Sequence, residues 1–464
     1  MQGKIKALFG AQDMTTGNPM RNLLRFSVPL LIGNFAQQTY STVDAIIVGK
    51  YVGDEALAAV GASNPIVFLL LILMMAISSG AGIMVSQYFG AKDKKLLSKT
   101  IGTSVVMVFL ASVVITALGV TLSPKLLSFL GTPDNIFDMA RQYLTIIFIG
   151  TVASAFYNII SGILRGMGDS VTPLLFLLLA TLLNTVLDVY FVRNLGWGVA
   201  GAAWATIFSQ AVSATLCIRR LFQIRDTVDM NRETIRLDKA LALQLLKLGI
   251  PAGLTQAVFS LAQVAVQRLT NSMGSDVVAV TTVVMRVDGF AMLPNFTFGM
   301  AIATFVGQNI GAGLMDRVDR GSRDGAKLTF LTSSALTLCL LLFGKNLATL
   351  FTQTEAIIEL AGRMFRILAV GYIAMGLSQV FAGILRGAGD TMPSLWISII
   401  TTVAIRVPVA YCIAFLTRSE LHPNGSPDAL YISLLTAWIS GAIINYLWFR
   451  RGKWRDKSII GKVR

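Results

Sequence analysis

Long apolar stretches recur along the chain from Phe26 to Phe449, separated by short polar segments. A helix of about 20 residues spans the roughly 30 Å hydrocarbon core of a bilayer. Of the 464 residues, 54% are hydrophobic and only 14% are charged, whereas soluble globular proteins carry about 25% charged residues. We count twelve such stretches. The sequence therefore predicts an all-α integral membrane protein with twelve transmembrane helices, surrounded by a lipid bilayer.

The formal net charge of +15 is unevenly distributed along the chain. Lys and Arg cluster in segments 92–99, 219–239, 317–327 and 450–464, which alternate with segments that hold few of them. Basic loops remain on the cytoplasmic side of a membrane protein. The pattern predicts a multi-pass protein of a bacterial or archaeal inner membrane with both termini in the cytoplasm. It explains the basic excess without a nucleic-acid partner, and no obligatory protein partner is evident.

The two halves of the chain repeat one another. The segment Gly162-Ile-Leu-Arg-Gly-Met-Gly-Asp169 recurs as Gly383-Ile-Leu-Arg-Gly-Ala-Gly-Asp390, at an offset of 221 residues. Gln87 and Gln308 keep the same offset. The repeat predicts an N-terminal six-helix lobe (1–218), a cytoplasmic linker (219–240) and a C-terminal six-helix lobe with a basic tail (241–464). The Gly-rich segments lack the strand that a phosphate-binding loop requires, and we expect tight turns there.

Each half contains an even number of helices, so the two lobes have the same orientation and are related by a pseudo-two-fold axis along the membrane normal. Parallel repeats of this kind are typical of transporters that alternate access to a central cavity. A duplicated passive scaffold is the alternative. A scaffold, however, has no need of ionisable groups inside the membrane.

Two carboxylates of the first half lie within apolar helices. An ionisable residue in the hydrocarbon costs about 2.5 to 3.5 kcal/mol and is a functional hypothesis by default. Asp44 lies in the first helix and Asp188 in the fifth, with Asn184 one turn from Asp188 on the same face. Thr206 in the sixth helix falls at a similar depth. These four residues offer the hard oxygen ligands that a small cation such as Na⁺ prefers, and the carboxylates suit a proton equally well.

The second half differs from the first. Asp288 and Arg406 share one depth in the membrane and could neutralise each other as an ion pair, with Arg286 as a competitor for Asp288. The sole histidine, His422, lies in a loop, and the three cysteines are widely separated. No cofactor and no His/Cys metal site is expected. The chain also lacks the G-x-S-x-G and H-E-x-x-H motifs, so an intramembrane enzyme is disfavoured.

The chain resembles the multidrug and toxic compound extrusion (MATE) family over nearly its whole length. The resemblance lies in several motifs: Pro29, Val43-Asp44, Ala56-Leu-Ala-Ala-Val-Gly61, Gln87-Tyr-Phe-Gly90, the two Leu-Arg-Gly-x-Gly-Asp turns and Gln308-Asn-Ile-Gly-Ala312. It implies two six-helix lobes around a central cavity and efflux of compounds against entering Na⁺ or H⁺.

Within that family the chain is similar to the DinF-like branch. This resemblance implies a cation site in the first lobe formed by Asp44, Asn184, Asp188 and Thr206. It adds a polar network whose members match Gln37, Tyr143 and Asn158.

These observations predict an antiporter, not an enzyme, that exports organic cations or amphipathic drugs and metabolites in exchange for Na⁺ or H⁺. The coupling ion would be its only required small partner besides the substrate. One alternative is a flippase for lipid-linked oligosaccharide or peptidoglycan precursors, which requires a strongly cationic cavity. A passive channel is a second alternative, and it would carry no compound against its gradient.

Overall fold

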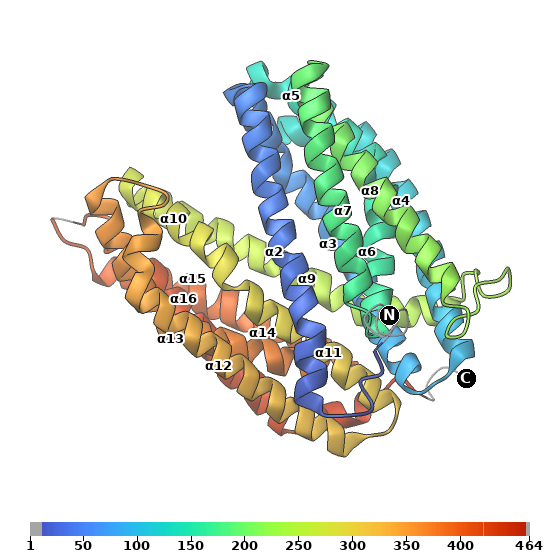
Figure 1. Ribbon diagram of the computed structural model, residues 1–464. Helices are drawn as coiled ribbons and strands as arrows, with labels where there is room; N and C mark the ends of the chain where they lie inside the picture. Colours follow the sequence, from blue (N-terminus) through green and yellow to red (C-terminus); the bar gives the residue numbers. More distant parts are fainter. Residues whose placement is uncertain (1–11, 421, 461–464) are drawn as a thin grey trace. The chain divides into compact units, whose positions relative to one another are not determined.

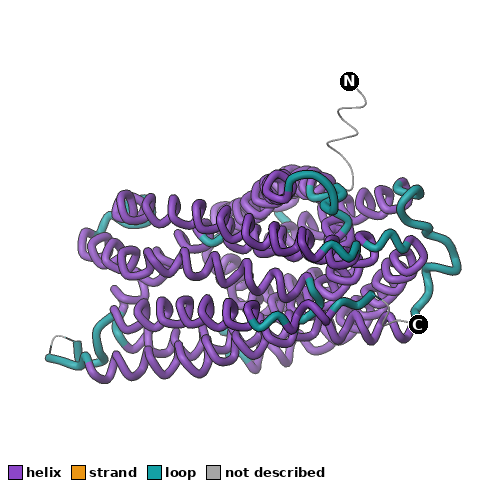
Figure 2. Tube along the Cα trace, turned by 90° about the horizontal axis from the view of Figure 1, so that it is seen from below, coloured by secondary structure: helices purple, strands orange, loops and turns teal. Residues whose placement is uncertain are grey.

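The computed structural model describes residues 12–420 and 422–460, apart from a few side chains in the helices at 19–51 and 54–90. Helix accounts for nearly all of this part of the chain, and no strand occurs in it (Figures 1 and 2). The elements of the first half are α2 (Pro19–Tyr51), α3 (Asp54–Gly90), α4 (Lys94–Phe129), α5 (Asp134–Ile149), α6 (Thr151–Gly166), α7 (Val171–Asp188), the π-helix η1 (Val189–Asn194) and α8 (Gly198–Gln223). Those of the second half are α9 (Lys239–Ser272), α10 (Ser275–Ala291), α11 (Leu293–Gly311), α12 (Met315–Ala348), α13 (Glu355–Gly387), α14 (Met392–Ser398), the π-helix η2 (Ile399–Arg406), α15 (Val407–Leu416), α16 (Asp428–Arg450) and the 3-10 helix η3 (Lys453–Lys457).

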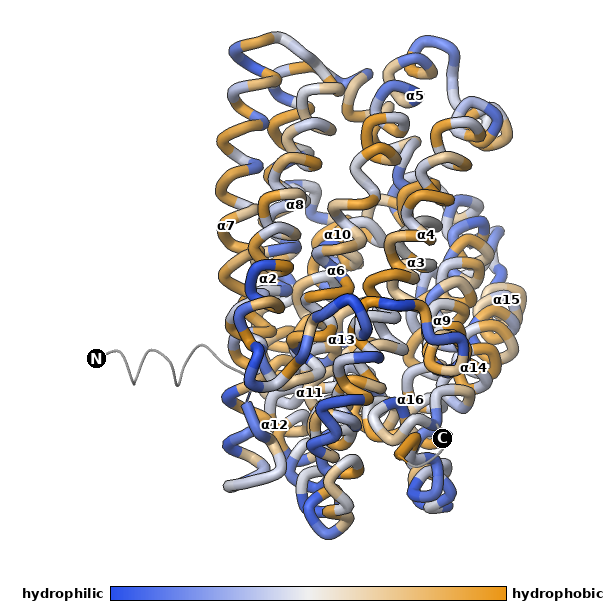
Figure 3. The backbone as a smooth tube through the Cα atoms, turned by 90° about the vertical axis from the view of Figure 1, so that its right-hand side faces the viewer, coloured by the Kyte–Doolittle hydropathy of each residue, from blue (hydrophilic) through white to orange (hydrophobic). Residues whose placement is uncertain are grey.

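The number of membrane-spanning helices agrees with the sequence. Within residues 12–420 and 422–460, nine helical segments are long and apolar enough to cross a bilayer, and α5 with α6 forms a tenth that bends by 49°. The helices α2 and α3 are 33 and 37 residues long, which is also enough to cross a bilayer. Together with the nine segments and the bent pair, they give twelve membrane-spanning helices. Apolar residues run along these helices, and hydrophilic residues gather in the connecting segments (Figure 3). The prediction of an all-α membrane protein with twelve helices is confirmed.

The chain forms two compact units. Unit 1 contains Val28–Gly253 with short pieces of both termini, and unit 2 contains Leu254–Ser458 with Met14–Ser27. The units thus divide within α2 and α9, next to Pro29 and Pro251, and each of these helices contributes its first turns to the other repeat's unit. The predicted linker at 219–240 separates the two sequence repeats. The compact units divide elsewhere, because the first turns of α2 belong to unit 2 and the first turns of α9 belong to unit 1.

Repeat-related glutamines hold segments from the chain's two ends. In unit 2, Gln308 Oε1 accepts a hydrogen bond from the main-chain N–H of Met14 at 2.9 Å, and Asn309 Nδ2 donates to the Met14 carbonyl at 3.2 Å. In unit 1, Gln87 Oε1 accepts from the N–H of Ile459 at 2.9 Å. Met14 and Ile459 are both buried. The repeated glutamines therefore satisfy buried main-chain donors that would otherwise lack partners.

The repeated Gly-rich segment has two structural roles. Its last glycine forms the predicted tight turn, since Gly168 and Gly389 have φ values of +87° and +91°. Its first glycine lies on a helix that packs closely against a neighbour. A Cβ atom on Gly383 of α13 would lie 2.3 Å from the Gly299 carbonyl oxygen of α11, whereas one on Gly162 of α6 would lie 3.6 Å from its nearest neighbour.

This difference predicts unequal effects of one substitution at equivalent positions. We expect Gly383→Ala to lower the free energy of unfolding by about 1 to 3 kcal/mol, because the added methyl group overpacks the contact between α11 and α13. Gly162→Ala is the matched control, since its methyl group meets only ordinary van der Waals contacts. Thermal unfolding of the two purified variants in detergent measures the effect. Equal stability of the two variants would contradict this account.

Candidate functional site: an acidic cluster in unit 1

The cluster forms where α7 ends. Asp188 is the last residue of α7 and is 0% exposed, and Asn184, one turn earlier, is 1% exposed. Leu182 and Val186, on other faces of α7, are exposed. Apolar residues thus face outward while the amide and carboxylate face the interior of unit 1. The π-helix η1 follows directly, and π-helical turns occur frequently at functional sites.

Asp44 and Asp188 face each other across α2 and α7. Their side chains lie within hydrogen-bonding reach of one another. The Oδ1 atom of each is buried and has no hydrogen-bond partner. Two carboxylates in contact, each with an unsatisfied buried oxygen, repel one another unless a cation or a proton lies between them.

An amide and a hydroxyl complete the cluster. The Asn184 amide satisfies both of its atoms when its nitrogen donates to Asp188 Oδ2 at 2.7 Å and its oxygen accepts from Thr206 N at 3.1 Å. The opposite orientation leaves only a 3.4 Å contact from Nδ2 to Thr206 Oγ1, so we assign the first. The structure therefore brings together Asp44, Asn184, Asp188 and Thr206, as the sequence predicts. Their role in cation binding stays a prediction.

Two tyrosines border the four residues. The Tyr40 hydroxyl of α2 lies 3.2 Å from Thr206 Oγ1. Tyr143 of α5 lies close enough to interact electrostatically with both carboxylates. Tyr143 belongs to the predicted polar network, but Tyr40 was not among the predicted residues. The sequence nevertheless indicates this residue, because Tyr40 precedes Asp44 by one helical turn and therefore lies on the same face of the helix.

The other two members of the predicted network are Asn158 and Gln37. Asn158 Nδ2 donates to the Ser154 carbonyl at 2.8 Å, within its own helix α6. The Gln37 side chain is exposed on α2. Tyr143 thus borders the acidic cluster, and a role of Gln37 and Asn158 in the polar network stays a prediction.

Removing the Tyr40 hydroxyl tests its contribution. We expect Tyr40→Phe to weaken binding of the coupling cation by about three- to tenfold. This is the effect of losing one hydrogen bond to the Thr206 hydroxyl, which is a predicted ligand of the cation. Tyr190→Phe is the control, since Tyr190 is exposed on η1. Isothermal titration of each purified variant with the coupling cation measures the affinity. Unchanged affinity in Tyr40→Phe would exclude Tyr40 from the site.

In unit 2 the predicted ion pair between Asp288 and Arg406 does not form. The Tyr372 hydroxyl donates a hydrogen bond to Asp288 Oδ1, and Arg406 Nη2 donates to Gln263 Oε1 at 3.0 Å. None of the five ion pairs found in the described part of the chain joins the two charges. Sequence position gives depth along a helix axis but not the direction in which a side chain leaves it. Equal depth was therefore insufficient evidence for contact.

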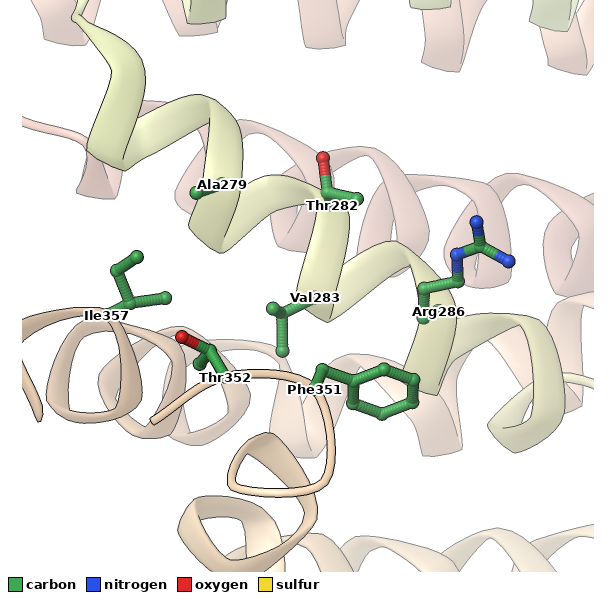
Figure 4. Close-up of a pocket in the computed structure, with 7 residues that line it drawn as sticks. All are labelled: Ala279, Thr282, Val283, Arg286, Phe351, Thr352 and Ile357. Carbon is green, nitrogen blue, oxygen red and sulfur yellow. The ribbon is translucent and has the colours of Figure 1, made fainter. Parts of the chain in front are cut away.

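A separate pocket of about 320 Å³ lies in unit 2 between α10 and the segment that joins α12 to α13. Its lining residues are Ala279, Thr282, Val283, Arg286, Phe351, Thr352 and Ile357. Arg286 extends away from the segment that carries Phe351 and Thr352 (Figure 4). The pocket contains no acidic residue and contributes nothing to the acidic cluster of unit 1.

The chain matches known proteins over most of its length. A sequence model of the MatE family matches residues 29–190 and 251–412, one match in each half. The chain is 31% identical over 450 residues to the probable multidrug resistance protein YpnP of Bacillus subtilis (strain 168), covering 97% of this chain and 99% of that protein. It is 30% identical over 424 residues to the probable multidrug resistance protein YoeA of the same bacterium, covering 89% and 92%.

A solved structure agrees with these sequence matches. An outward-facing conformation of a multidrug resistance MATE family transporter of the MOP superfamily has a TM-score of 0.88 to this chain at 26% identity, covering 96% of this chain and 97% of that one. The two matched segments also coincide with the internal repeat, since they begin at Pro29 and Pro251. The chain therefore belongs to the MatE family of multidrug and toxic compound extrusion transporters.

Proposed function

We propose that this transporter exports small organic compounds, cationic or amphipathic, in exchange for Na⁺ or H⁺ that enters through the acidic cluster of unit 1. The observation that carries the proposal is the contact between Asp44 and Asp188, each with a buried and unpartnered carboxylate oxygen. The names of YpnP and YoeA as probable multidrug resistance proteins support efflux of drugs. The composition of the cluster supports assignment to the DinF-like branch.

The cluster can accept either ion. A sodium ion would be held by oxygens of Asp44, Asp188, Thr206 and Asn184, with the Asn184 amide turned to present its oxygen. A proton would be held on one carboxyl group, which then donates a hydrogen bond to the other. Either ion removes the repulsion between the two carboxylates. Among the described residues no three or more His, Cys, Asp or Glu side chains are grouped so that they could hold a metal ion, so the neutral oxygens are needed to complete a cation shell.

Coupling requires that the cluster bind its cation unequally in the outward-facing and inward-facing states. A ligand that binds both states with equal affinity shifts no equilibrium. α2 carries Asp44 and also passes from unit 2 into unit 1 at Ser27–Val28. A bend of α2 that moved Asp44 relative to α7 would change the distance between Asp44 and Asp188, and with it the affinity for the cation. The basic segments favour a cell-membrane location with both termini in the cytoplasm.

Transport in proteoliposomes tests the proposal. Purified protein is reconstituted with a fluorescent organic cation, and a Na⁺ gradient and a pH gradient are imposed separately. We expect one of the two gradients to drive the dye against its concentration gradient. Dye movement that only follows its own gradient would indicate a passive channel. Movement of a fluorescent lipid-linked sugar without dye transport would favour a flippase. Either outcome would refute cation-coupled efflux.

A further inference from the structure

Arg406 is a cation buried in unit 2 with most of its donors unused. It is the last residue of the π-helix η2 and is 5% exposed. Its Nη2 atom donates to Gln263 Oε1 of α9 at 3.0 Å, whereas Nε and Nη1 are buried and have no hydrogen-bond partner. Arginine is almost never fully buried unless it is paired. The structure therefore leaves a positive charge whose partner is not within the described chain.

The internal partner predicted from the sequence is engaged elsewhere. Asp288 accepts the hydrogen bond of Tyr372, and no ion pair in the described part of the chain includes Arg406. Long cationic side chains near helix ends extend to the membrane surface, but Arg406 does not reach water because it is buried. An acidic group from outside the chain is the remaining source of compensation.

The backbone around Arg406 is specialised as well. η2 interrupts the helical segment Met392–Leu416 with π-helical turns. A π-helical turn contains an extra residue, which redirects the side chains that it carries, and such turns are frequent at functional sites. Thr402, four residues before Arg406 in η2, is 7% exposed and has a hydroxyl that can serve as a second donor. Gln263 adds an amide, so the site offers donors of three types.

Position along the membrane decides which kind of molecule can supply the acid. Arg406 lies 10 residues from Leu416 and 14 residues from Met392, the two ends of the span. At 1.5 Å per residue it is about 15 Å or more from either end. Lipid head groups lie at the ends of a span. An acidic group that reaches Arg406 must therefore be carried by a molecule inside the transporter.

We propose that Arg406, with Gln263 and Thr402, binds a carboxylate or phosphate group of the transported compound. This inference rests on the proposed efflux function and specifies its substrate class. The exported compounds then include zwitterions and other molecules with an acidic group, and are not limited to simple organic cations. Gln263 orients the guanidinium, which leaves Nε and Nη1 available to the ligand.

A matched pair of dyes tests the proposal by equilibrium binding, which requires no ion gradient. The pair is a rhodamine with a free carboxylate and its methyl ester, which differ in that one acidic group. Binding is measured by fluorescence anisotropy for wild type, Arg406→Gln and Arg406→Lys in nanodiscs of phosphatidylcholine. We expect Arg406→Gln to weaken binding of the free acid about tenfold, which is about the effect of losing one charge-assisted hydrogen bond. Binding of the ester should weaken less than about twofold, because the ester lacks the acidic group. Arg406→Lys should retain part of the affinity for the free acid.

Arg286→Gln is the control, because Arg286 is exposed on α10 of the same unit and should not distinguish the dyes. Equal loss of affinity for both dyes in Arg406→Gln would indicate a structural role and overturn the proposal, as would no loss for either.

If replacing gluconate by chloride raises the melting temperature of wild type but not of Arg406→Gln, and the dyes are not distinguished, the site binds an inorganic anion instead. If phosphatidylglycerol abolishes the preference of wild type for the free acid, a lipid occupies the site. Failure of gradient-driven transport with intact dye discrimination would refute only the coupling mechanism.

Discussion

Asp188→Asn is expected to abolish cation-coupled efflux. The substitution keeps the size and shape of the side chain but replaces one acceptor oxygen by a donor and removes a carboxylate to which we assign the coupling cation. We expect uphill dye transport to fall about 100-fold, in the upper part of the range of coupling free energies between two sites. Dye efflux from proteoliposomes under the gradient that drives wild type measures the loss.

Asp226→Asn is the control for this experiment, because Asp226 is an exposed carboxylate in the segment between α8 and α9. It should transport as wild type does. The dye should still bind Asp188→Asn at equilibrium, since our proposal assigns the coupling ion, and not the compound, to the cluster. Wild-type rates in Asp188→Asn under both gradients would show that the acidic cluster is not the coupling site.

Asp44→Asn is expected to stabilise the protein while it removes coupling. In Na⁺-free buffer, at a pH high enough to remove a shared proton, both carboxylates of the cluster are charged and lack a cation, and Asp44 Oδ1 is buried without a partner. Neutralising one of them removes their repulsion and allows the new amide to donate to Asp188. We expect a gain of about 0.5 to 2 kcal/mol, as for other substitutions that relieve a strained functional site. Thermal unfolding of the purified protein measures it.

The coupling cation should also lose its effect on unfolding. A ligand that binds only the folded state raises the melting temperature of wild type with concentration. The Asp44→Asn variant, which retains a single carboxylate, should show little of this rise.

Asp288→Asn is the matched comparison, because this carboxylate has a donor in Tyr372. Its substitution weakens a charge-assisted hydrogen bond and should lower the melting temperature. A lower melting temperature for Asp44→Asn as well would mean that the cluster is satisfied in the absence of its cation, and the account of repulsion would be wrong.

Much of the acidic cluster was predictable from sequence because its members are polar residues in apolar helices. Asp188 and Asn184 are one turn apart, and this spacing alone places them on one face. The same rule applied to Asp44 would have found Tyr40, whose hydroxyl contacts Thr206.

The second half shows where such reasoning fails. Asp288 and Arg406 share a depth, yet they contact Tyr372 and Gln263. Each of these partners lies on a helix distant in sequence, so no local pattern identifies it. The π-helical geometry of η2 is equally hidden, because most of its residues are β-branched, as in many ordinary membrane helices, and no local pattern marks the π-helical turns.

The sequence by itself determined the twelve helices, the internal repeat, the turns at Gly168 and Gly389 and the presence of acids in the membrane. These features depend on hydrophobicity, on spacing and on the φ angles that glycine permits, all of which are local properties of the chain. The tertiary structure decided which polar groups meet, where α2 and α9 pass between units, and why Gly383 must be small while Gly162 need not be. These outcomes depend on the rotation of each helix about its axis, which is set by packing against neighbours from other parts of the chain.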